Sequence, residues 1–156
     1  MTIFTTTSNI ASPVNPFFTD YDTSFQIPPF EEIKMEHYKP GFEQGMQEHL
    51  DEINDITDNK DVATFENTIV ALERTGETLD KVSDVFFNLL SSNTNDQMDS
   101  LAQEISPKLS AHRDTILLNK DLYSRVKSVY DSRTTLNLNP EQTRLIEETH
   151  KYFVRA

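Results

Sequence analysis

Residues 41–53 read GFEQGMQEHLDEI, and the spacing within this stretch decides the fold class. Its apolar residues recur at intervals of four, four and three, which places them on one face of an α-helix: Phe42, Met46, Leu50 and Ile53. Gly41 and Gly45 form a G-x-x-x-G motif, which in an apolar segment would favour pairing of membrane helices. Because this stretch is rich in Glu, Gln and Asp, we expect the glycines to allow close packing of helices in water instead.

The helical periodicity continues in a second segment that begins near residue 64. Thr64 is a favourable N-cap, and Glu66 lies in the first turn, where the helix dipole stabilises a negative charge. Gly76 lies in the middle of the segment and costs about 1 kcal/mol relative to Ala, so it predicts a bend or a break into two shorter helices. The apolar stripe of this segment consists of Ile69, Leu72, Leu79, Val82, Phe86 and Leu89.

A loop at residues 91–96, SSNTND, separates this segment from a third helix. Thr94 followed by Gln97 predicts a capping box at the start of that helix. Pro107 predicts either a kink or a position near a helix start. The expected inward face consists of Met98, Leu101, Ile105, Leu109, His112 and Ile116.

Two shorter helices complete the pattern. The fourth has a predicted inward face of Leu122, Val126, Val129 and Tyr130. The fifth begins with Asn139 as N-cap, Pro140 at the first helical position and Gln142 two positions later. Its predicted stripe is Leu145, Thr149, Tyr152 and Phe153. No segment alternates as a strand does, so we predict an all-α fold with about five helices in an antiparallel, bundle-like array.

The N-terminal part of the chain has a different character. Residues 1–35 hold four of the seven prolines, and residues that precede proline are pushed towards extended conformations. We therefore predict an extended arm at 1–35 and a helical domain at 36–156. The arm is too apolar for a free tail, and we expect some of the following residues to dock onto the helices: Phe17, Phe18, Phe25, Ile27 and Phe30.

Composition excludes several classes of function. The 156 residues carry a formal net charge of −12, so we expect neither nucleic acid nor an anionic membrane as a partner. The absence of cysteine excludes disulfides, thiolate zinc sites and cysteine nucleophiles. The first residues lack the basic and apolar regions of a signal peptide. We expect a cytoplasmic protein, with the periplasm as the alternative.

Few residues are candidates for chemistry. Glu147 and His150 have the i, i+3 spacing used in di-iron bundles, but no second such pair is present, so we interpret them as an ordinary solvent-facing pair. His112 lies on an apolar stripe, and we interpret it as a core or boundary residue. The chain contains neither an H-E-x-x-H zinc motif nor a G-x-S-x-G nucleophile elbow. We therefore assign no catalytic, cofactor-binding or metal-binding residue.

Several stretches, taken in order, resemble the N-terminal region of the thimet oligopeptidase / oligopeptidase A family, and its bacterial peptidyl-dipeptidase branch most of all. They include NPFF, IPPFEEIKMEHYKPGFEQGM, FENTIVALERTGETLDKVSDVFFNLLSSNTND and LNLNPEQTRLIEETHKYFVRA. The resemblance implies an almost wholly helical zinc metallopeptidase with a deep channel between two lobes. It also implies that an H-E-x-x-H helix and a later Glu hold the zinc, and that dipeptides are released from the C-terminus of short peptides.

The zinc motif of that family is absent from this chain, so no catalytic residue carries over. The resemblance then implies an N-terminal helical scaffold that walls the substrate channel, is inactive alone, and partners the C-terminal catalytic region of the same polypeptide. The final EETHKYFVRA (147–156) ends without a helix C-cap, and we expect the family's sequence to continue beyond it. We also expect such a fragment to self-associate. The alternative is a free-standing helical interaction module without catalytic activity.

Overall fold

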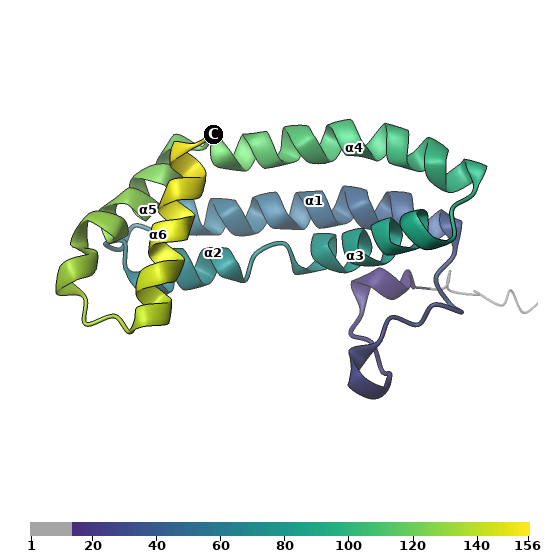
Figure 1. Ribbon diagram of the computed structural model, residues 1–156, viewed down its shortest axis with the longest axis horizontal. Coiled ribbons are helices and arrows are strands. Elements are labelled where there is room, and N and C mark those ends of the chain that lie inside the picture. Colours follow the sequence, from purple (N-terminus) through teal and green to yellow (C-terminus); the bar gives the residue numbers. More distant parts are fainter. Residues whose placement is uncertain (1–13) are drawn as a thin grey trace, which may run out of the picture.

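The computed structural model describes residues 14–156, in which the regular structure is helical and no strand occurs, so the predicted all-α class is confirmed. The α-helices are α1 (Met35–Asp58), α2 (Ala71–Glu73), α3 (Glu77–Ser92), α4 (Asp96–Leu117), α5 (Lys120–Ser132) and α6 (Pro140–Val154). A π-helix, η3 (Phe65–Val70), leads directly into α2. Helices α1, α3 and α4 run along the long axis of the molecule, whereas α5 and α6 lie together at one end (Figure 1).

The glycines of α1 allow its close contact with α3, as the G-x-x-x-G spacing predicts. A Cβ atom added at Gly45 would lie 2.9 Å from both the Cα and the N atom of Leu79. One added at Gly41 would lie 2.9 Å from a methyl group of Val82 and 3.2 Å from the ring of Phe17. Any larger residue would therefore force the two helices apart.

Two apolar clusters form the core, one at each end of the long axis. One joins the arm to α1, α3 and α4, and contains Phe17, Tyr38, Phe42, Leu79, Val82, Val85, Phe86, Met98 and Ile105. The other joins α1, η3, α4, α5 and α6, and contains Ile53, Ile56, Phe65, Ile69, Ile116, Leu122, Val126, Val129, Ile146 and Phe153. Because α1 and α4 contribute to both clusters, the two ends of the molecule are held together by continuous helices.

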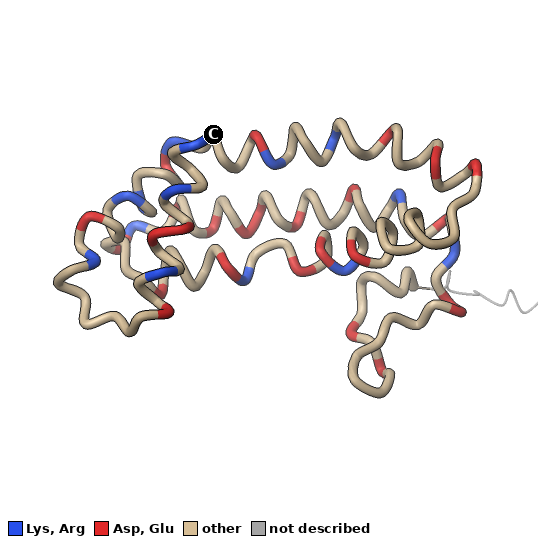
Figure 2. The backbone as a smooth tube through the Cα atoms, viewed as in Figure 1, with Lys and Arg blue, Asp and Glu red and all other residues tan. Residues whose placement is uncertain are grey.

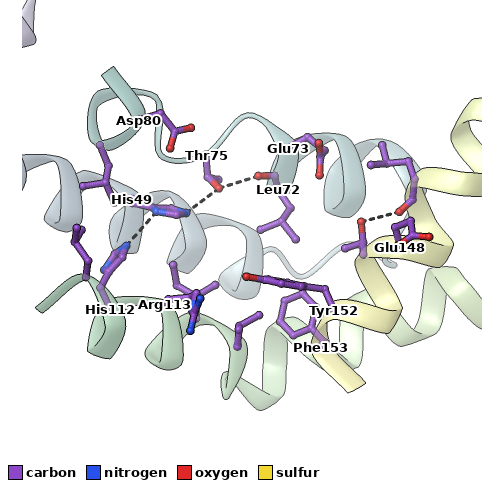
Figure 3. A pocket seen from close by; sticks show the side chains of 16 residues that line it. His49, Leu72, Glu73, Thr75, Asp80, His112, Arg113, Glu148, Tyr152 and Phe153 are labelled. Carbon is purple, nitrogen blue, oxygen red and sulfur yellow. Dashed lines mark hydrogen bonds between the residues drawn. The ribbon is translucent and has the colours of Figure 1, made fainter. Parts of the chain in front are cut away.

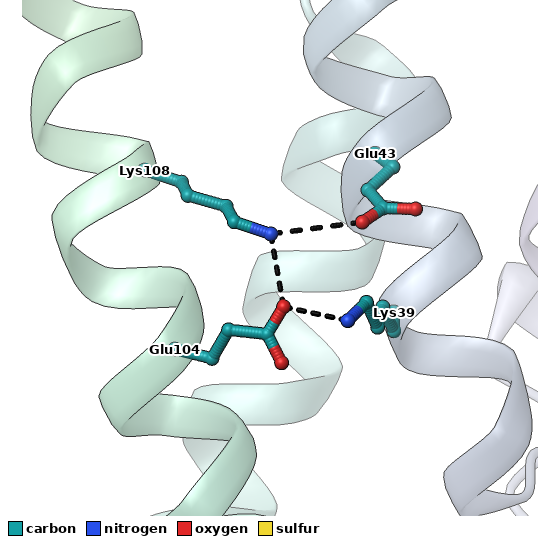
Figure 4. Close-up of polar contacts among 4 residues, drawn as sticks. All are labelled: Lys39, Glu43, Glu104 and Lys108. Carbon is teal, nitrogen blue, oxygen red and sulfur yellow. Dashed lines mark hydrogen bonds and ion pairs between the residues drawn. The ribbon is translucent and has the colours of Figure 1, made fainter.

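An ion-pair network also joins α1 to α4 (Figure 4). Glu104 of α4 accepts hydrogen bonds from Lys39 of α1, at 2.6 Å, and from Lys108, at 2.9 Å. Lys108 also lies 3.6 Å from a carboxylate oxygen of Glu43 on α1. The hydrogen bonds from the two lysines lower the pKa of Glu104 to about 2. All four side chains are exposed to solvent, so each pair contributes little to stability.

Three of the predicted features at helix ends are confirmed. The Thr64 hydroxyl accepts a hydrogen bond from the Asn67 amide at 3.1 Å and caps η3. Gly76 has a φ of 83°, in the left-handed region, and separates α2 from α3 as a break between two shorter helices. Asn139, Pro140 and Gln142 form the predicted start of α6, with a reciprocal capping box.

The predicted cap of α4 is wrong. Asn95 caps the helix, because its side-chain oxygen accepts hydrogen bonds from the amides of Gln97 and Met98, each at 3.0 Å. Thr94 instead donates its hydroxyl proton to Asp99. Asn is at least as good an N-cap as Thr, and here it lies one residue nearer to the helix. Of the two alternatives for Pro107, the position near a helix start is excluded, since α4 continues through this exposed residue, and a kink stays a prediction.

The predicted inward stripe of α6 is wrong in part. Ile146 and Phe153 are the buried residues of α6, and they pack into the cluster shared with α5. Leu145 and Thr149 are half-buried, and Tyr152 is 54% exposed. The buried face is therefore turned by about one residue from the predicted stripe, because α5 lies on that side of α6. Leu145, Thr149 and Tyr152 face a groove instead.

The arm docks through Phe17 and Phe18, of which Phe17 is buried and Phe18 half-buried. Phe17 is 1% exposed and packs on Tyr38, with ring centroids 5.5 Å apart, while the Asn15 side chain donates a hydrogen bond to the His37 carbonyl at 2.9 Å. Phe25 is 96% exposed, and Ile27 and Phe30 are each 51% exposed. Residues 1–13 of the predicted arm lie outside the described residues. The docking prediction thus holds for Phe17 and Phe18 and fails for Phe25, Ile27 and Phe30.

Candidate functional site

A groove of about 650 Å³ lies between α4 on one side and the α2–α3 junction on the other, with α6 across one end (Figure 3). Its surface is mostly apolar and is contributed by Leu72, Leu79, Leu109, Ile116, Leu145 and Phe153. Charged side chains stand around the opening: Glu73, Asp80, Arg113 and Glu148. The groove exists because α6 packs on α5 through Ile146 and Phe153, which leaves its neighbouring face without a helix partner.

Two histidines form one wall of the groove. His112 Nε2 of α4 lies 3.1 Å from His49 Nδ1 of α1, and His49 Nε2 lies 3.1 Å from the Thr75 hydroxyl oxygen. The Thr75 hydroxyl donates its proton to the Leu72 carbonyl at 2.8 Å. Its oxygen must therefore accept from His49 Nε2–H, which leaves His49 Nδ1 to accept from His112 Nε2–H. Each group thus donates to the next, from His112 to His49, from His49 to Thr75 and from Thr75 to the Leu72 carbonyl, and this order fixes the tautomers of both rings.

This arrangement favours neutral imidazoles. Burial lowers the pKa of His49 below 6.5, although the charges of Glu52 and Asp80 act in the opposite direction. Burial also lowers the pKa of His112, and the neighbouring His49 lowers it further. A second proton on His49 would remove the acceptor that His112 uses. The pair is thus a neutral structural contact that joins α1 to α4, which agrees with the interpretation of His112 as a core or boundary residue.

His49 was not singled out from the sequence, although a signal for it exists. It lies three residues after Met46 and four before Ile53, which is the spacing of the inward face of α1. Its partner is 63 positions away in the sequence, and neither residue alone predicts the pair.

Glu147 and His150 each contact a different partner and do not form a shared site. Glu147 lies 3.6 Å from the Arg133 guanidinium. His150 stacks on the Tyr130 ring, with centroids 3.8 Å apart and an angle of 6° between the planes. Arg133 covers the same tyrosine ring at 3.9 Å. The i, i+3 spacing thus places both residues against the α5 end of the molecule.

The chain does not fit the zinc centre that the resemblance implies. Among residues 14–156, no group of three or more His, Cys, Asp or Glu side chains could hold a metal ion. The two histidines that do meet use their facing nitrogens to bind each other.

Within the described residues, no helix combines the length and the apolar composition needed to cross a membrane. Acidic residues outnumber basic ones along α1 and α3 (Figure 2).

Comparison with known proteins gives the family context. No family model matches the chain. The dipeptidyl carboxypeptidase of Escherichia coli (strain K12) is 38% identical over 143 residues, which make up 92% of this chain and 21% of that protein. The dipeptidyl carboxypeptidase of Salmonella typhimurium is 36% identical over 142 residues, again 21% of its length. The resemblance seen in the sequence is thereby confirmed: the chain is similar to two dipeptidyl carboxypeptidases and spans about a fifth of their length.

Proposed function

We propose that this chain is a non-catalytic helical segment of a longer zinc-dependent peptidyl-dipeptidase, where it forms part of the wall of the substrate channel. The observation that carries the proposal is the 38% identity over 92% of the chain to a protein named dipeptidyl carboxypeptidase. The complete enzyme would release dipeptides from the C-terminus of short peptides. The arm at 1–35 and the helical domain at 36–156 would both belong to this wall, and we place the enzyme in the cytoplasm.

The packing of the described residues supports a structural role. Backbone contact at Gly45, two apolar clusters and the network around Glu104 tie three long helices into one stiff layer. A channel wall must keep its shape while peptides pass, and continuous helices shared between two clusters resist local opening.

The polar residues of the groove support a structural role for this chain, with catalysis supplied by the rest of the polypeptide. The histidines in the groove satisfy each other, and the nearest carboxylates are distributed around the opening without forming a pair. The zinc ligands and the base that activates water would come from the rest of the polypeptide. This chain would contribute shape, the exclusion of large substrates and contacts with the catalytic part.

A chimera tests the proposal. This chain replaces the matched 143-residue segment of the Escherichia coli relative, and release of C-terminal dipeptides from a short synthetic peptide is followed by mass spectrometry. We expect the chimera to be active, and both the deletion of the segment and the isolated 156-residue chain with added zinc to be inactive. A folded but inactive chimera, or dipeptide release by the isolated chain, would overturn the proposal.

The alternative is a free-standing helical interaction module. Closed apolar clusters at both ends of the described chain favour independent folding, which such a module requires. A chimera that folds without activity, together with a stable monomeric chain, would favour this alternative.

A further inference from the structure

The groove described above is an apolar surface without a partner in the described residues. Leu109 of α4 and Leu145 of α6 both line it and are half-buried, and Tyr152 of α6 is 54% exposed. The volume of about 650 Å³ lies within the range of roughly 300–1,000 Å³ that is typical of occupied binding sites. The groove is therefore large enough to take several apolar side chains at once.

The shape of the groove indicates what kind of element fits it. Its sides are helices, α4 opposite the α2–α3 junction, and α6 closes one end (Figure 3). A long apolar floor between helices suits the apolar face of another helix, whose side chains recur every three or four residues.

The charges around the opening indicate the polarity of the occupant. Glu73 and Asp80 form no ion pair with any described residue, and Glu148 approaches only Lys151, at 3.8 Å. Burial and the nearby Asp84 raise the pKa of Asp80, so this carboxylate would gain from a neighbouring cation. Arg113 is the basic residue of the lining, and the three carboxylates outnumber it. Lysine or arginine on the occupant would complement this opening.

The source of the occupant follows from the comparison of lengths. The chain corresponds to 21% of each relative, so about four fifths of those proteins lies outside it. We propose that the groove seats an amphipathic helix with apolar and basic side chains, supplied by the part of the longer polypeptide that this chain does not contain. The inference rests on the proposed function and adds to it a specific contact between the helical wall and the remainder of the enzyme.

The absence of cysteine makes the contact testable by thiol labelling. Thr149→Cys places a thiol in the groove, and Ser128→Cys places one on the exposed face of α5 as a control. Each variant is prepared in the isolated chain and in the chimera described above, and labelling with iodoacetamide is followed by mass spectrometry of the peptide that contains the new cysteine. We expect labelling at residue 149 to slow by roughly tenfold or more in the chimera, with no change at residue 128.

A second pair of variants tests the charge of the occupant. Glu73→Gln with Asp80→Asn should speed labelling at residue 149 in the chimera by roughly threefold or more at low salt, because opposite charges at the opening attract most strongly there. The matched neutralisations Asp55→Asn and Asp114→Asn, at exposed positions outside the groove, should leave the rate unchanged.

Each outcome decides a separate point. Equal labelling of residue 149 in the isolated chain and in an active chimera would overturn the docked helix and leave the proposed function intact. Protection that appears in the isolated chain and grows with its concentration would assign the groove to a second copy, and would also overturn the inference. If the labelling rate of residue 149 in the chimera is the same with and without the two neutralised carboxylates, the basic character of the occupant is refuted.

Discussion

Replacing Gly45 by alanine tests the closest contact in the fold. The new Cβ would lie 2.9 Å from the Cα and N atoms of Leu79, whereas carbon atoms in contact normally lie about 3.5–4.0 Å apart. Because the atoms it meets belong to the backbone, no rotation of a side chain relieves the clash. Helices α1 and α3 must therefore separate by at least about 0.6 Å.

The magnitude is the difference between two opposing effects. Alanine in place of glycine inside a helix stabilises by about 1 kcal/mol. Overpacking a close contact costs about 1–3 kcal/mol, and a backbone contact belongs at the upper end of that range. We expect a net loss of about 1–2 kcal/mol for Gly45→Ala. Gly41→Ala should lose less, because its nearest neighbours are side-chain atoms of Val82 and Phe17.

The assay is urea unfolding followed by circular dichroism at the helix band, with a control that isolates helix propensity. Ser110 is exposed on α4, and Ser110→Ala should stabilise by up to about 0.5 kcal/mol. If Gly45→Ala is as stable as the unchanged chain while the control behaves as expected, the close packing of α1 on α3 is refuted.

The remaining predictions concern the histidine pair, the α4 cap and the arm. Because burial lowers the pKa of both histidines, the unfolded chain binds protons before the folded chain as pH falls below 6.5, and the free energy of unfolding falls with it. His112→Asn should make that fall smaller between about pH 7 and pH 5, as measured by urea titrations at each pH. Asn95→Ala should cost about 1 kcal/mol and Thr94→Ala less than about 0.5 kcal/mol, and the reverse order in thermal unfolding would refute the corrected cap. Phe17→Ala should cost roughly 3–5 kcal/mol, whereas Phe25→Ser should change stability by less than about 0.5 kcal/mol; equal losses would contradict the one-sided docking of the arm.

The sequence predicts the local parts of this fold well, for physical reasons. Helix periodicity, the cap at Thr64, the break at Gly76 and the start of α6 at Asn139 all depend on residues within a few positions of each other. The error at Thr94 arises because a second capable cap, Asn95, follows directly, and propensity alone does not choose between neighbours.

Features that depend on packing between distant segments could not be predicted in the same way. The α6 stripe depends on where α5 approaches, so Tyr152 has apolar spacing and yet remains exposed. Contact between His49 and His112 joins residues from two separate helices. The groove is lined by this histidine pair and by the face of α6 that α5 does not cover, and no sequence motif predicts it. The resemblance in ordered stretches indicates the functional class, whereas the described residues include no group of three or more His, Cys, Asp or Glu that could hold a metal ion.

The most direct test of the central claim is the rate of C-terminal dipeptide release by the chimera that carries this chain in the Escherichia coli relative. We expect a kcat/KM within roughly tenfold of that relative, equivalent to ~1.4 kcal/mol of transition-state stabilisation, because in the proposed function the chain supplies the wall and none of the chemistry. A soluble, helical chimera without measurable dipeptide release would contradict it.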